Sequence, residues 1–384
     1  MSVSVENRRN RLRSTTAAVL TVLLLVPFGL LFARHWDSTT ERREQTATER
    51  QGVEYLARLA PLMTVLTELQ SSALQGSKST PTGLQDAVNG VAEVDQRLGE
   101  ALGTRERWAD LRERIDALPR AAGGPAAVLD AHIVAGDLLL GLFDAVRDSS
   151  RLLRDPDNDL SHLQQAVAAD LPEAITQSGR MADLSVLLAD ADAAARLELT
   201  PQFGAAVEGV DETVDELTEN LEVAVTGTSS RTLSGSLISP LDAFRRGIET
   251  LTRDVNPTGK PNEAALIVSR TQLRQTLAPI NNTILKEMDG LLQRRLDDID
   301  ADRREAIMIA AVAGLIALLS LATVIGPALR RRRASTTPGD SKHDGDRAAD
   351  AVAVPMHGNS PHDPVPQFGN EVPPTRREQF GALR

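Results

Sequence analysis

Six side chains of this sequence have the chemistry needed to hold a small anion between helices. The candidate ligand-binding residues are Arg50, Tyr55, Arg58, Arg147, Arg151 and Arg154. A guanidinium group matches the oxygens of a carboxylate or a nitrate. Arg147, Arg151 and Arg154 are spaced by four and three, so they share one helix face. The alternative is that these arginines pair with nearby acids, such as Glu54 and Asp155, on a solvated surface.

Other kinds of chemistry find little support. The chain has no cysteine, which excludes disulfides, thiolate metal sites and a cysteine nucleophile. The sequence holds no Gly-x-Ser-x-Gly motif and no glycine-rich phosphate loop. His132 and His162 have no ligand partners at helical spacing, and the acids Asp297, Asp298 and Asp300 do not have the spacing of a calcium loop. We therefore expect no enzymatic activity, no cofactor and no metal site.

Two uncharged apolar stretches, residues 15–33 and 306–329, have the length of membrane-spanning helices. A helix needs roughly 20 residues to cross a bilayer. Arginines 8, 9, 11 and 13 precede the first stretch and arginines 330–333 follow the second. Because clustered basic residues stay in the cytoplasm, residues 1–14 and 330–384 are predicted to be cytoplasmic and residues 34–305 extracytoplasmic. A cleaved signal peptide is the alternative for the first stretch, but Leu31-Phe32-Ala33-Arg34 makes a poor cleavage site.

The region between these stretches reads as helix nearly throughout. Heptad-like apolar seams run through residues 39–75 and 261–305, and each is predicted to continue into its membrane span. Further helices are predicted over residues 84–118, 126–154, 157–199, 201–225 and 237–255, with a kink or break near Asp170 caused by Pro172. The fold class predicted is all-α: a long antiparallel helical bundle, in one or two tiers, outside the membrane and flanked by two transmembrane helices.

Charge and composition refine this prediction. Residues 34–305 hold 29 Lys and Arg against 45 Asp and Glu, so the bundle carries a net charge of −16. Such a surface repels nucleic acid, and no nucleic-acid partner is expected. The proline-rich segment 334–384 has few large apolar residues and is predicted to be disordered. Small residues in the second span, such as Gly314 and Ser320, fit a homodimer.

Two stretches resemble the extracytoplasmic helical domains of bacterial chemoreceptors and sensor histidine kinases. The first is Glu49-Arg50-Gln51-Gly52-Val53-Glu54-Tyr55-Leu56. The second runs from Asp148-Ser149-Ser150 through Asp155-Pro156-Asp157 to Leu171-Pro172. The layout also resembles nitrate/nitrite-sensing and helical bimodular sensor domains.

The resemblance implies a membrane sensor in the plasma (inner) membrane, whose outer bundle binds a small ligand or partner. No signalling module of those families follows the second stretch here, so the signal is expected to pass to a separate cytoplasmic protein. The alternative function is a non-catalytic membrane scaffold that binds cell-envelope proteins.

Overall fold

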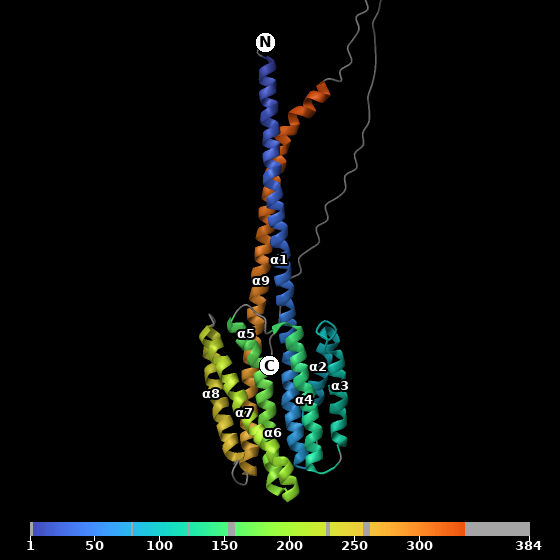
Figure 1. Ribbon diagram of the computed structural model, residues 1–384, viewed down its shortest axis with the longest axis vertical. Helices are drawn as coiled ribbons and strands as arrows, with labels where there is room; N and C mark the ends of the chain where they lie inside the picture. The colour runs from blue at the N-terminus through green and yellow to red at the C-terminus, as the bar shows by residue number, and fades with distance from the viewer. Residues whose placement is uncertain are drawn as a thin grey trace, which may run out of the picture. The chain divides into compact units, whose positions relative to one another are not determined.

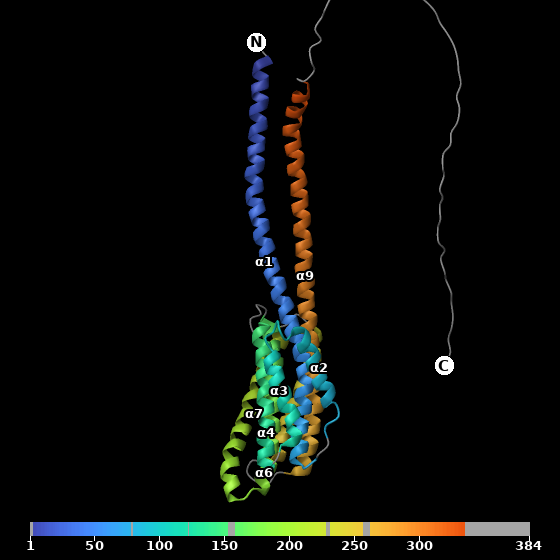
Figure 2. The same ribbon diagram turned by 90° about the vertical axis from the view of Figure 1, so that its right-hand side faces the viewer.

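The chain is built from α-helices (Figures 1 and 2). The computed structural model describes residues 3–77, 80–121, 123–152, 158–227, 231–255 and 262–334, and no strand occurs in these ranges. The elements in order are α1 (Val3–Leu74), α2 (Leu84–Leu98), α3 (Arg105–Ala117), the 3-10 turn Leu118–Arg120, α4 (Pro125–Ser149), α5 (Asn158–Gln165), the π-helical segment Ala166–Asp170, α6 (Leu171–Asp190), α7 (Ala193–Gly227), α8 (Arg231–Val255) and α9 (Glu263–Ala334). The predicted all-α class is confirmed.

The helices lie beside one another over a common length (Figures 1 and 2). α2 and α4 pack on α1, and α3 packs on α4; α7 packs on α6, and α8 packs on both. Contacts of α1 and α4 with α6 join these two groups. The helices therefore form adjacent bundles rather than two stacked tiers.

α1 and α9 are the two longest helices, at 72 residues each. The seam predicted on α1 is confirmed, because Leu56, Leu59 and Met63 are all at most 3% exposed. On α9, Ile280, Ile284 and Met288 are fully buried. Each helix leaves the bundle at the same end without a break (Figures 1 and 2), as the continuous seams predicted.

Three helices are long and apolar enough to cross a membrane: α1, α4 and α9. They indicate a membrane protein. The most apolar windows of α1 and α9 are 0% buried inside the protein, whereas 33% of the window in α4 is buried. The candidate span in α4 was not among the two spans that the sequence predicted.

The predicted helix 84–118 is wrong in one respect, because the chain turns between α2 and α3. Gly103 adopts a positive φ of 63°, and the amide of Thr104 donates to the carbonyl of Gly99. Glycine adopts this left-handed backbone without steric cost. Val94 and Leu102, on the two sides of the start of this turn, are both at most 1% exposed. The spacing of buried apolar residues therefore continues across the turn, and the sequence pattern does not reveal it.

The kink or break predicted near Asp170 falls at a π-helical segment, Ala166–Asp170, which joins α5 to α6 without a break in the helix. The boundary predicted at Pro201 is wrong: Pro201 lies inside α7, and the chain turns at Ala191 and Asp192 instead. The carboxylate of Asp192 accepts hydrogen bonds from the amides of Ala194 (3.0 Å) and Ala195 (2.9 Å), an N-cap that begins α7. α8 begins at Arg231, earlier than predicted, and most of the predicted disordered tail lies outside the described residues.

The two stretches that carry the family resemblance meet at Gly52. A Cβ atom placed on Gly52 would lie 2.5 Å from the Cβ of Ser150 and 3.2 Å from Leu152. Ser150 is fully buried and donates through Oγ to the carbonyl of Val146 at 2.6 Å. The glycine therefore permits close approach of α1 to the end of α4.

We predict that Gly52→Ala destabilises the full-length protein by about 1–3 kcal/mol, because the added methyl overpacks this contact. Gly90→Ala in α2 is the matched control: its Cβ would meet only Arg58, at 3.8 Å. That change should stabilise by roughly 0.5 kcal/mol through helix propensity. Denaturant unfolding in detergent measures both, and equal effects of the two variants would contradict the close approach.

Candidate functional site

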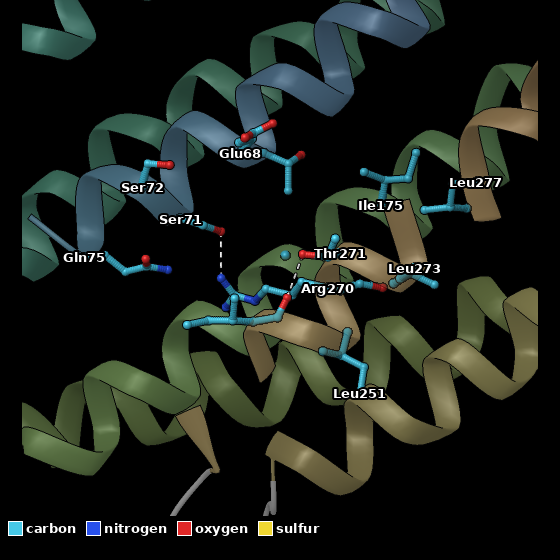
Figure 3. A pocket seen from close by; sticks show the side chains of 14 residues that line it. Glu68, Ser71, Ser72, Gln75, Ile175, Leu251, Arg270, Thr271, Leu273 and Leu277 are labelled. Carbon is cyan, nitrogen blue, oxygen red and sulfur yellow. Dashed lines mark hydrogen bonds between the residues drawn. The ribbon is translucent and has the colours of Figure 1, made fainter. Parts of the chain in front are cut away.

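A cavity of about 170 Å³ lies inside the bundle at the end of α1 that is farther from its apolar segment. Its walls come from α1, α6, α8 and α9 (Figure 3). Ser71 of α1, Gln75 just after α1 and Arg270 of α9 supply polar groups, while Ile175 of α6 and Leu251 of α8 are apolar. The cavity thus joins the first and last helices to the helices between them.

Arg270 is the central side chain of this cavity (Figure 3). Its Nη1 lies 2.6 Å from the carboxylate of Asp183 on α6 and donates to the hydroxyl of Ser71 at 2.7 Å. Gln70 donates through Nε2 to the second carboxylate oxygen of Asp183 at 2.7 Å. The side chain of Asp183 is 3% exposed and that of Arg270 is 15% exposed. A buried charge of each sign is therefore paired, as charges in an interior must be.

Two nitrogens of the Arg270 guanidinium have no hydrogen-bond partner. Nε and Nη2 are both buried and unpaired. These two N–H groups form one edge of the planar guanidinium and point in parallel, the arrangement that matches two oxygens of a planar anion. An unsatisfied buried donor costs about 1–3 kcal/mol. Arg270, which lines the cavity, therefore keeps a donor pair without an acceptor among the described residues.

The apolar side of this cavity continues into a second one. Ile175 and Leu277 line both the first cavity and a neighbouring cavity of about 270 Å³. The second cavity is bounded by Pro61 and Val65 of α1 and by Phe143 of α4. Apolar side chains thus line two neighbouring cavities along α1, between Arg270 and the end of the bundle where the apolar segments of α1 and α9 leave it.

Arg50 lies on α1 against α9. Its Nε is 2.7 Å from the carboxylate of Asp289. This hydrogen bond raises the pKa of Arg50, and its effect is larger than the opposing effect of burial. Both side chains are about half exposed, with 42% for Arg50. Arg50 also lines a polar groove with Glu54 and Lys286.

Tyr55 points the other way, into the core, and is fully buried. Its hydroxyl donates to Asp95 at 2.8 Å, and Thr104 donates to the same oxygen at 2.7 Å. Burial, with a smaller contribution from Asp95, raises the pKa of Tyr55. Tyr55 therefore ties α1 to the α2–α3 turn.

The other predicted ligand residues lie apart from these. Arg58 is exposed on α1, and Arg147 pairs within α4 with Asp144 at 2.8 Å. Arg151 is exposed just after α4, with a φ of 61°, and Arg154 lies outside the described residues. The described residues of the predicted set do not converge on one cavity, and the ligand-binding role assigned to them stays a prediction.

A separate buried polar cluster surrounds the π-helical segment. Asp170, 2% exposed, accepts from Gln165 at 2.8 Å and from Asn220 of α7 at 2.7 Å. His162 lies 2.7 Å from the amide oxygen of Asn220. Burial raises the pKa of Asp170 against the opposing effect of these bonds. The cluster fixes α5 and the π-helical segment onto α7.

The sequence analysis did not select Arg270 or Asp183. A usable signal existed for Arg270, because Leu266, Arg270, Leu273 and Leu277 are spaced by four, three and four. An arginine at such a position of an apolar seam faces the interior. Asp183 gave no comparable signal, since its burial depends on α6 packing against α1 and α9.

Comparison with known proteins adds no assignment: no protein-family model, curated protein or solved structure matches this chain.

We predict that Arg270→Leu destabilises the protein by about 3–5 kcal/mol, because it leaves the carboxylate of Asp183 buried and unpaired. The double variant Arg270→Leu/Asp183→Leu should be markedly more stable than the sum of the single changes predicts. Arg97→Gln, which breaks the exposed pair of Arg97 with Glu54, is the control and should leave the melting temperature unchanged. Strict additivity in denaturant unfolding would argue against the buried pair.

Proposed function

We propose that this chain is a membrane-anchored, receptor-like sensor whose helical bundle binds a small ligand and passes a conformational signal to a separate protein. The observation that carries this proposal is the composition of the cavity wall. Ser71 and Arg270 lie on α1 and α9, the two helices that continue into exposed apolar segments. A ligand in this cavity contacts both helices directly.

In this proposal α1 and α9 cross the membrane and α4 does not. α4 packs against α1, α3 and α6, and buries Leu139 and Leu142 completely. A helix placed in lipid would lose those contacts. The basic residues flanking the two remaining spans support a topology with both flanks in the cytoplasm and the bundle outside.

Single cysteines test this topology, since the chain has none of its own. We predict that Glu106→Cys, before α4, and Glu212→Cys, after it, both react with a membrane-impermeant maleimide on intact cells. Both positions are exposed on the bundle surface. Ser4→Cys should react only after permeabilisation. Labelling of positions 106 and 212 from opposite sides would show that α4 is a span and would overturn the proposed topology.

Signal transfer requires α1 and α9 to move relative to each other, and polar contacts near the membrane hold them in register. Arg43 pairs with Asp300 at 2.8 Å, and Glu49, fully buried, pairs with Arg295 at 3.4 Å. Packed helices shift between discrete arrangements by about 1–2 Å. A change at Arg270 that shifts the position of α9 in the bundle is therefore transmitted along this continuous helix to its apolar segment.

We predict that Asp183→Asn, which weakens the hold on Arg270, shifts the distance between spin labels at Arg42→Cys and Ala301→Cys by about 1–2 Å. Double electron–electron resonance on full-length protein in nanodiscs measures this distance. The control, Asp211→Asn, changes an exposed acid of α7 and should leave the distance unchanged. Identical distance distributions for Asp183→Asn and the parent would show that the cavity and the membrane end are not coupled.

A further inference from the structure

We propose that the ligand of the Arg270 cavity is a monocarboxylate with an apolar body, such as a short-chain fatty acid. The inference rests on the proposed sensor function and names the chemical class of its ligand. It arises from two features of one cavity: a lining arginine, Arg270, with two buried and unpaired donors, and apolar side chains among the other lining residues.

The free edge of Arg270 selects a carboxylate by its geometry. Nη1 is already committed to Asp183 and Ser71, which leaves Nε–H and Nη2–H as a parallel pair. A carboxylate accepts both with its two oxygens, and charge strengthens each bond. A neutral carbonyl offers one oxygen, and an ammonium group offers no acceptor at all.

The surroundings of Arg270 select an apolar body and a single charge. Ile175, Leu273 and Leu277 line the same cavity, on the side away from Ser71 and Gln75 (Figure 3). Leu273 and Leu277 are at most 5% exposed, so a chain lying against them leaves water. Glu68 is an acid of the cavity lining, so a ligand with two carboxylates would meet more like charge than a ligand with one.

The hydrogen-bond network around Asp183 allows Arg270 to bind one more anion. The charge of Asp183 is shared among Arg270 Nη1, Gln70 Nε2 at 2.7 Å and the hydroxyl of Ser71 at 3.4 Å. The guanidinium is therefore able to bridge two carboxylates, one internal and one from the ligand. Ligand binding would satisfy the two orphan N–H groups and fix Arg270 between α6 and α1.

The size of the ligand follows from the two cavities. The first holds about 170 Å³ and the second, which shares Ile175 and Leu277, about 270 Å³. A chain of several methylene groups extends from Arg270 past these two residues. Acetate has the charge and lacks this chain, so it should bind more weakly.

Four probes that differ in one property each test the proposal on full-length protein in nanodiscs. Hexanoate carries charge and chain, hexanamide and hexylammonium carry the same chain with another head group, and acetate carries the charge alone. Thermal unfolding is followed by the fluorescence of Trp36 and Trp108. We expect a saturable rise in melting temperature with hexanoate. Hexanamide and hexylammonium should give no such rise, and they control for partitioning into lipid.

Arg270→Lys is the decisive variant, because it keeps the charge opposite Asp183 and removes the paired donors. Its affinity for hexanoate should fall at least about tenfold. Arg253→Lys, at an exposed position of α8, makes the same substitution away from the cavity and should bind as the parent does. Equal binding of hexanoate by the parent and by Arg270→Lys would overturn the proposal.

The remaining outcomes separate the ligand class from the sensor function. Binding of hexanamide as tightly as hexanoate, or no binding of any carboxylate, overturns the ligand class even if Asp183→Asn still shifts the spin-label distance. Hexanoate binding that depends on Arg270 supports the ligand class even when that distance stays constant. The latter result would count against the sensor function alone.

Discussion

The pairing of α1 with α9 just beyond their apolar segments is the constraint on which the structure depends. The carboxylate of Glu49 is fully buried and relies on Arg295 as its cation, so sliding one helix by a residue would strand a charge in the interior. Arg303 adds to this by lying 4.4 Å from the centre of the Trp36 ring and donating to Thr40. The two apolar segments therefore leave the bundle together and in fixed register, and the shorter helices pack around this pair.

The long helices could be predicted because their burial is strictly periodic, as at Leu56, Leu59 and Met63. The turns between shorter helices were harder, for a physical reason. At Gly103 the buried period passes through the turn, so hydrophobicity alone does not mark it. At Asp192 the signal was a capping carboxylate, while the more conspicuous Pro201 fits within α7.

The residues of the candidate site were harder to predict for a different reason. Which arginine faces the interior depends on the register between helices that lie far apart in the sequence, and Ser71 and Arg270 are 199 residues apart. Arginine at helical spacing, as at Arg147 and Arg151, is equally suited to a solvated surface, and the pair of Arg147 with Asp144 is of that kind. An arginine whose neighbours at helical spacing are apolar, as at Arg270, is the pattern that indicates an interior position rather than a solvated one.

Two buried ion pairs involve α1 or its polar neighbours, one toward each end of the bundle, and they differ in how well their polar groups are satisfied. Near the exposed apolar segments of α1 and α9, Glu49 is held by Arg295 and Gln45, so this pair fixes one arrangement of the helices. At the far end, Gln70 and Asp183 are satisfied but Arg270 keeps two N–H groups without acceptors. Each orphan donor raises the free energy of the empty state by about 1–3 kcal/mol. In the proposed sensor, a ligand at the far end changes the balance between packings, and the continuous helices α1 and α9 carry that change to their apolar segments.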